Sequence, residues 1–132
     1  MTRAEFFRAC AAGLAAVGLA SRAAAQERGA LRLFVIRYRA GPAWREGLPM
    51  ERQALGPHAH YYADLLADGR LVAGGRFVES ETGMAILRLR TRAEAEAILA
   101  ADPAIVSGVF AGELSEWRPR FQTSDPLPPP SP

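Results

Sequence analysis

The chain has 132 residues, of which 49% are hydrophobic and 23% are charged, the proportions of one ordinary globular domain rather than of a disordered chain. Its formal net charge is +2, and all sixteen basic residues are arginines, scattered among fourteen acidic residues. Because binding to nucleic acid requires basic residues gathered on one face or in one run, no nucleic-acid partner is expected.

Residues 1–25 are predicted to be a signal peptide. Arg3 and Arg8 give a positively charged start, an apolar run follows over residues 9–20, and residues 23–25 are the small residues that signal peptidase requires. Cleavage after residue 25, by the Sec route or a degenerate twin-arginine route, would place the protein in the periplasm or outside the cell. The apolar run is too short to span about 30 Å of hydrocarbon, so no stable membrane anchor is expected. It contains the only cysteine, so the mature protein would have no thiol chemistry.

The folded domain is expected over residues 31–121. Residues 122–132 contain five of the ten prolines and no apolar periodicity, and are expected to form a disordered tail. A first strand is predicted over residues 31–38, with apolar residues on both faces. The glycines and prolines of residues 40–49 indicate an irregular loop.

A helix is predicted to follow, with Pro57 in its first turn and Gly69 as a left-handed C-terminal cap. Four residues lie at helical spacing on its predicted buried face: Leu55, Ala59, Tyr62 and Leu66. Residues 70–78 are predicted to form a second strand, and the Gly74-Gly75 pair in it indicates a bulge or the close approach of a ligand. A hairpin leads to a third strand over residues 84–90.

The second helix is predicted to begin at a capping box, in which Thr91 and Glu94 each satisfy a free backbone N–H. Asp102 and Pro103 end it, because the residue before a proline is pushed out of helical geometry. A last strand over residues 107–117 completes the order β-α-β-β-α-β. The prediction is an α+β, ferredoxin-like fold, with an antiparallel sheet and two helices on one face. A homodimer packed sheet against sheet would cover the other, partly apolar face.

These features together resemble the YciI-like (YCII-related domain) family. The resemblance is carried by His58 with Gly69 eleven positions later and by the segments 71–75, 83–89, 95–103, 108–110 and 116–117. Gly75 stands where the family usually has a proline. The resemblance implies a fold of the dimeric α+β barrel type, with a cleft beside His58 and Asp102. That fold is similar to the fold of muconolactone isomerase, and the analogy alone does not fix a function.

His58 follows the proline at the start of the first helix, where the helix dipole favours the neutral imidazole that a general base needs. Asp102 is expected to orient the ring through its other nitrogen. The predicted catalytic residues are therefore His58 and Asp102, and the predicted substrate-binding residues are Arg37, Tyr61, Gly74 and Arg76. The arginines would bind a carboxylate or a phenolate.

The leading functional hypothesis is a cofactor-independent lyase or isomerase that acts on a small acidic or aromatic substrate. The alternative is a non-catalytic module that binds a small ligand or only assembles as a dimer. In that case His58 would be packed with backbone partners, and Asp102 would only cap a turn. No metal site is expected, because His58 and His60 are two positions apart on a helix and point to different faces.

Overall fold

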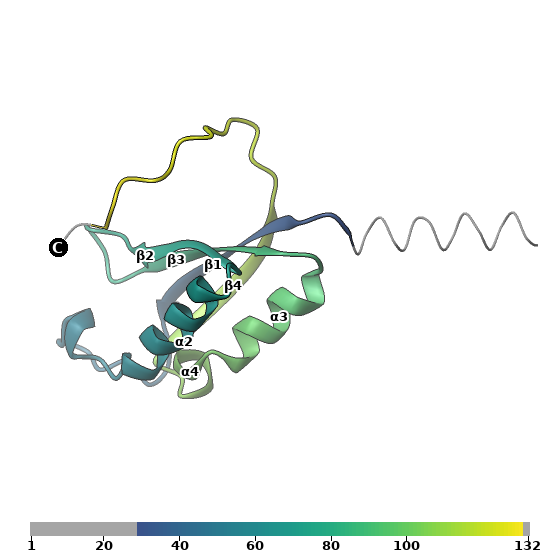
Figure 1. Ribbon diagram of the computed structural model, residues 1–132. Coiled ribbons are helices and arrows are strands. Elements are labelled where there is room, and N and C mark those ends of the chain that lie inside the picture. Colours follow the sequence, from purple (N-terminus) through teal and green to yellow (C-terminus); the bar gives the residue numbers. More distant parts are fainter. Residues whose placement is uncertain (1–28, 131–132) are drawn as a thin grey trace, which may run out of the picture.

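The structure is a computed structural model, and it describes residues 29–130 (Figure 1). The predicted signal peptide lies outside the described residues. The elements in chain order are β1 (Arg32–Ala40), the 3-10 helix η1 (Met50–Arg52), α2 (Gly56–Ala67), β2 (Leu71–Arg76), β3 (Gly83–Leu89), α3 (Arg92–Ala101), α4 (Pro103–Val106) and β4 (Phe110–Trp117). Within residues 29–130, no helix is long and apolar enough to cross a membrane.

The four strands form one antiparallel sheet in the order β2-β3-β1-β4. The helices α2, α3 and α4 lie on one face of this sheet, and the segment 118–130 runs past the opposite face (Figure 1). This arrangement confirms the predicted α+β, ferredoxin-like fold. The central strand β1 is flanked by β3 and β4, so side chains on β1 lie at the middle of both faces.

The alternation of side chains along β1 separates the core from the open face of the sheet. Phe34, Ile36 and Tyr38 point toward the helices and are almost fully buried. Their neighbours Leu33 and Val35 point to the opposite face and are only partly buried. The core between sheet and helices is completed by residues from the other elements: Tyr62, Leu65, Leu71, Ala85, Leu87, Leu89, Ala95, Ile98, Ala104 and Phe110.

The buried face of α2 differs from the predicted one. Leu65 is 2% exposed, whereas Leu66, which was expected in the core, is 57% exposed. The stripe that faces the sheet consists of the partly buried His58 and the buried Tyr62 and Leu65 rather than the predicted set, although both contain Tyr62. Helical spacing alone permits either stripe, and the packing of α2 on the sheet selects the one that includes the histidine. The left-handed cap is confirmed, since Gly69 has φ 73°.

Two further details correct the predicted elements. The irregularity in the β2–β3 ladder lies between Leu71 and Ala73, not at the glycine pair. Gly74 and Gly75 pair in regular register with Ala85 and Met84, so no bulge lies there. The short helix α4 was not predicted, and the last strand begins at Phe110 rather than at residue 107. The capping box of Thr91 and Glu94 is confirmed.

Candidate functional site

The structure brings His58 and Asp102 together, although they are 44 positions apart in the sequence. His58 lies in the first turn of α2, and Asp102 lies at the junction where α3 ends and α4 begins. The Nδ1 atom of His58 is 2.8 Å from Oδ1 of Asp102. The Asp102 side chain is fully buried, whereas the His58 side chain is 19% exposed. The histidine therefore connects a buried carboxylate with the surface.

Both oxygens of the Asp102 carboxylate accept hydrogen bonds. Oδ1 accepts from His58 and from the backbone N–H of Ala104 at 2.9 Å, and Oδ2 accepts from the Tyr38 hydroxyl at 2.9 Å. An ionised carboxylate only accepts hydrogen bonds, so the proton of the neutral imidazole lies on Nδ1. Asp102 thus both caps α4 and orients the histidine, and the two roles proposed as alternatives from the sequence coexist.

A buried tyrosine pair extends this network. Tyr38 donates its hydroxyl proton to Asp102, so its oxygen accepts from the hydroxyl of Tyr62. Burial, followed by the neighbouring Tyr62 and Asp102, raises the pKa of Tyr38 far above its usual value. Burial is also the main cause that raises the pKa of Tyr62. Both hydroxyls are therefore neutral donors, and the chain of bonds runs from Tyr62 through Tyr38 to the carboxylate.

Tyr38 was not among the residues predicted from the sequence. The available signal was its place on the buried stripe of β1, because a tyrosine in a core usually needs a partner for its hydroxyl. The sequence placed Tyr38 on a strand and His58 on a helix, and no local pattern showed that the two would meet.

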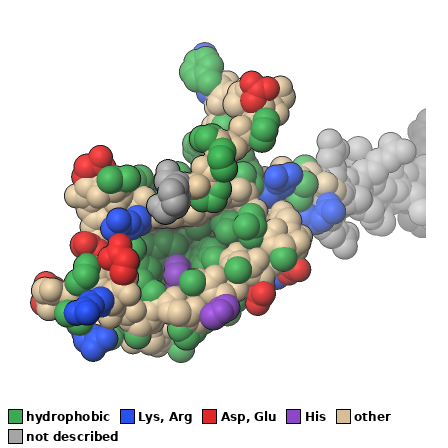
Figure 2. All heavy atoms as spheres, turned by 60° about the vertical axis from the view of Figure 1, so that its left-hand side comes forward, with side chains coloured by type: hydrophobic (Ala, Val, Ile, Leu, Met, Phe, Trp, Pro, Cys, Tyr) green, Lys and Arg blue, Asp and Glu red, His purple; other side chains and the backbone are tan. Residues whose placement is uncertain are grey.

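The second imidazole nitrogen remains available. Nε2 of His58 has no hydrogen-bond partner among the described residues. No buried nitrogen or oxygen of a described side chain lacks a partner, so this nitrogen is open to solvent. Figure 2 shows a hollow lined by hydrophobic side chains with a histidine at its floor, and His58 is the partly buried one of the two histidines. The arrangement leaves the second nitrogen of His58 without a partner among the described residues, on a side chain that is 19% exposed.

Aromatic side chains surround the histidine. Phe110 meets the His58 ring edge to face, with the ring centroids 5.4 Å apart, and Trp44 stacks on Phe110 with the centroids 5.8 Å apart. Tyr38 also lies edge to face with the imidazole, with the ring centroids 5.4 Å apart, and it is 5.3 Å from Phe110. The buried rings of Tyr38 and Phe110 thus pack beside the imidazole and restrict its orientation.

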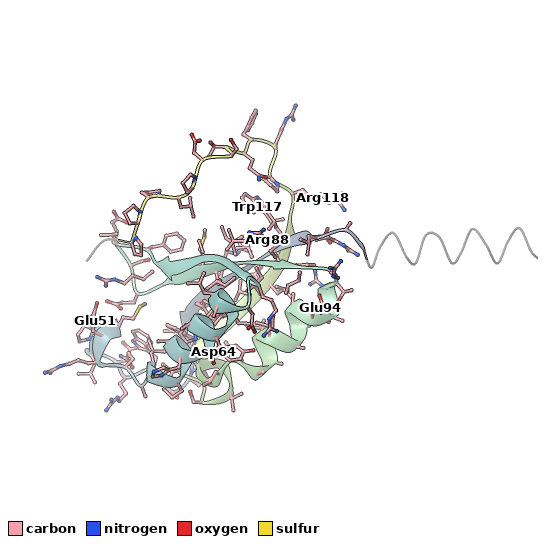
Figure 3. The ribbon with its side chains drawn as sticks, in the orientation of Figure 1. Glu51, Asp64, Arg88, Glu94, Trp117 and Arg118 are labelled. Atoms are coloured by element: carbon pink, nitrogen blue, oxygen red, sulfur yellow. The ribbon has the colours of Figure 1, made fainter. Side chains whose placement is uncertain are left out.

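Two of the predicted substrate-binding residues lie on the helix-covered side of the sheet. Arg76 occupies the end of β2 and forms an ion pair with Glu51 of η1 at 3.1 Å. Glu51 lies at the edge of the molecule below the β2–β3 hairpin (Figure 3). Gly74 lies two residues earlier on the same strand, opposite the buried Ala85. If the Arg76 guanidinium breaks its ion pair with Glu51, it becomes free to bind an anionic group of a ligand.

The other two predicted substrate-binding residues, Arg37 and Tyr61, do not lie beside His58. Arg37 points to the open face, where it pairs with Glu113 at 2.7 Å, because it is one position out of phase with Tyr38 on β1. The hydroxyl of Tyr61 donates to the carbonyl of Ile98 at 3.0 Å and so ties α2 to α3. Tyr61 lines a separate cavity of about 500 Å³, formed with the end of α2 and the edge of β3.

His60 does not join His58. Its Nδ1 bonds the carbonyl of Gly56 at 3.0 Å, and its side chain is exposed. Among the described residues, no three or more His, Cys, Asp or Glu side chains gather in a metal-binding arrangement.

Comparison with known proteins places this geometry in a family. The model of the YCII-related domain matches residues 32–118, which includes every strand of the sheet and both members of the His58–Asp102 pair. No curated protein matches the chain. Since the match spans well over half of the sequence, the protein belongs to the family of YCII-related domain proteins.

Proposed function

We propose that the protein is a cofactor-independent enzyme of the lyase or isomerase type, with His58 as its general base. The observation that supports this proposal is the state of the imidazole. Nδ1 is held by a fully buried carboxylate, and Nε2 of the partly exposed ring has no partner among the described residues. A base needs a lone pair within reach of the substrate and a group that stabilises the proton it gains.

In this proposal, Nε2 removes a proton from an acidic carbon of the substrate. The C–H electron pair moves into an adjacent carbonyl or aromatic system, and the Asp102 carboxylate stabilises the imidazolium through the Nδ1–H bond. The imidazolium then returns the proton to a different carbon, which completes an isomerisation. In a lyase reaction it protonates the leaving group instead. Tyr38 and Tyr62 do not contact the substrate in this scheme and act by holding Asp102 in place.

The substrate class is inferred from the aromatic surroundings of His58. Trp44, which is partly buried and stacks on the buried Phe110, suits contact with a flat aromatic or unsaturated compound. Arg76 is the nearest predicted anion-binding side chain on this side of the sheet, and it would exchange its ion pair with Glu51 for the carboxylate or phenolate of the ligand. Because both partners of this pair are largely exposed, the exchange costs little.

The experiment is to incubate the protein in D2O with a panel of small aromatic and unsaturated carboxylates and phenols. Deuterium incorporation and product formation are followed by NMR. We expect one chemical class to exchange or react with the wild type, and His58→Gln to abolish both effects. His60→Gln is the matched control and should retain them, because His60 lies on the outer surface. Turnover that survives in His58→Gln would contradict the mechanism, and tight ligand binding without exchange would favour the non-catalytic alternative.

We also propose that the protein is exported after removal of residues 1–25. The support is the charged start, the apolar run and the small residues at positions 23–25. Mass spectrometry of the protein from its native compartment should give an N-terminus at Gln26. An intact Met1 in the mature protein would contradict export.

A homodimer is the third part of the proposal. The open face of the sheet carries partly exposed apolar side chains, including Leu33, Val35 and Ile86 at its centre. Trp117 at the end of β4 is 43% exposed on the same face. A second sheet packed on this face would bury these side chains, at a typical separation of about 10 Å between the two layers.

A further inference from the structure

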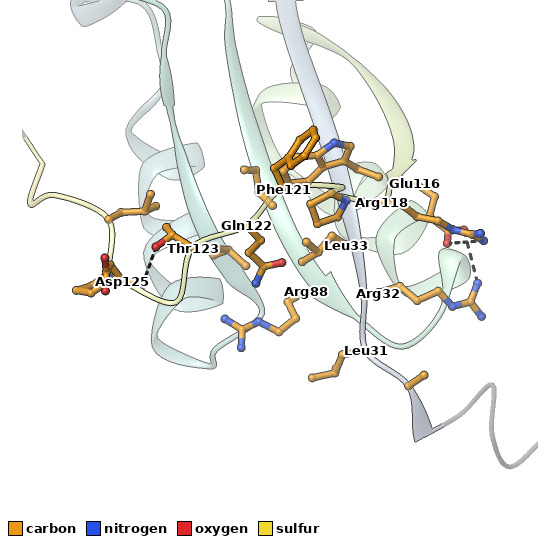
Figure 4. Close-up of a pocket in the computed structure, with 17 residues that line it drawn as sticks. Leu31, Arg32, Leu33, Arg88, Glu116, Arg118, Phe121, Gln122, Thr123 and Asp125 are labelled. Carbon is orange, nitrogen blue, oxygen red and sulfur yellow. Dashed lines mark hydrogen bonds and ion pairs between the residues drawn. The ribbon is translucent and has the colours of Figure 1, made fainter.

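The open face of the sheet forms one wall of a large cavity whose other wall is the C-terminal arm, residues 118–130. The cavity has a volume of about 1410 Å³. Its sheet side carries Leu33, Val72 and Arg88, and its arm side includes Phe121 and Asp125 (Figure 4). In Figure 3, Arg88 and Trp117 lie on the side of the sheet that faces the arm, while Asp64 lies on the helix side. The arm therefore reaches over the sheet without closing on it.

The arm is poorly packed against its own chain. Phe121 is 88% exposed and Leu127 is 63% exposed, although both line the cavity. No backbone hydrogen bond joins residues 118–130 to the sheet or the helices of the described chain. The cavity is also larger than the 300–1,000 Å³ of typical small-molecule sites. Its size and apolar walls fit a protein surface better than a small ligand.

Charges on the two walls are complementary. The guanidinium of Arg88 forms no ion pair within residues 29–130, and the carboxylate of Asp125 forms none there either. The other charged residues that line the cavity are already paired, since Glu116 forms ion pairs with Arg32 and with Arg118. Among the charged residues of the cavity walls, Arg88 on the sheet and Asp125 on the arm thus remain for an interaction between chains.

We propose that the arm crosses to a second copy of the chain and packs at the Leu31–Leu33 end of the partner's open face, with Asp125 beside the partner's Arg88, while the two sheets meet over the rest of that face. This inference rests on the homodimer proposed above and adds the segment that secures it. In a two-fold dimer, the same contact forms twice, and the exposed side chains of Phe121 and Leu127 become buried. The arm then serves as a clasp between subunits.

The test is a mixing experiment with two charge-reversal variants, Arg88→Glu and Asp125→Arg. Each variant alone would place like charges opposite each other in both contacts of its homodimer. In the mixed dimer, Glu at position 88 of one copy meets Arg at position 125 of the other, and the second contact keeps the native pair. We expect the ratio of mixed dimers to homodimers to exceed its random value of about one by about tenfold in native mass spectrometry. Contacts within one chain would give no such preference, because each variant is repulsive within itself.

The control pair is Arg52→Glu and Asp64→Arg, whose positions on η1 and α2 lie on the helix side of the sheet. It should mix at random. A wild-type dimer with random mixing of the two arm variants would overturn the clasp and leave the dimer intact. A wild-type chain that sediments as a monomer at all accessible concentrations would overturn the dimer and the clasp together, without bearing on the chemistry of His58.

Discussion

Replacing Asp102 with alanine is expected to lower the free energy of unfolding by about 3–5 kcal/mol. The carboxylate is fully buried and accepts from three donors, on His58, Tyr38 and Ala104. Alanine leaves the Tyr38 hydroxyl and the Ala104 N–H without an acceptor inside the core, and each buried donor left unpaired costs about 1–3 kcal/mol. The loss of the cap on α4 acts in the same direction.

Asp102→Asn removes the negative charge of the side chain but keeps its shape. The amide oxygen can take the place of Oδ1 and accept from His58 and Ala104, so the proton of the imidazole stays on Nδ1. The amide nitrogen then faces Tyr38, whose hydroxyl must accept from it and donate to Tyr62 instead. The tyrosine chain reverses direction and leaves one hydroxyl proton unpaired. The expected cost is about 1–3 kcal/mol, smaller than for alanine.

Urea denaturation of both variants, read with Asp64→Ala as control, measures these differences. Asp64 is an exposed carboxylate on α2 with no side-chain partner among the described residues, so its removal should change stability little. Once a substrate is known, Asp102→Asn should turn over slowly even though it folds, because the imidazolium loses its counter-charge. Equal stability of wild type and Asp102→Ala would mean that the buried network is not formed.

Much of the fold could be predicted because its signals are local. The capping box at Thr91, the glycine cap at Gly69 and the stop at Asp102 each depend on a few neighbouring residues, and all three are found where they were expected. The face of α2 could not be fixed in the same way. Two stripes sharing Tyr62 satisfy helical spacing, and only the packing against the sheet decides between Leu65 and Leu66.

The residues of the candidate site also fall into those that could be predicted from the sequence and those that only the packing shows. The pairing of His58 with Asp102 was predicted through the resemblance to a family, and the geometry agrees with it. Arg37 was predicted with them as an arginine of the first strand that could bind a carboxylate or a phenolate. The alternation of side chains puts it on the other face, and this phase was readable from the apolar residues Phe34 and Ile36. Tyr38, which shares their phase, was the residue to choose.

Alkaline pH is expected to destabilise the protein steeply above about pH 10, through its buried tyrosines. Below that pH, the hydroxyls of Tyr38 and Tyr62 keep their protons in both the folded and the unfolded chain, so stability does not depend on them. Above it, the unfolded chain releases these protons, whereas burial raises the pKa of both residues in the folded state. The unfolded state then binds fewer protons, and stability falls with rising pH by about 1.4 kcal/mol per pH unit for each tyrosine.

The composition makes this transition unusually clear to measure. The chain contains no lysine, and arginine remains charged throughout this range, so the three tyrosines are the main side chains that titrate near pH 10. Urea denaturation between about pH 9 and 11 should show the loss of stability, with the tyrosinate absorbance of Tyr38 and Tyr62 appearing only as the protein unfolds. Tyr38→Phe should roughly halve the slope, because it removes one of the two buried hydroxyls. Tyrosinate absorbance from all three residues in the folded protein near pH 10 would show that the Tyr62–Tyr38–Asp102 network is open to solvent.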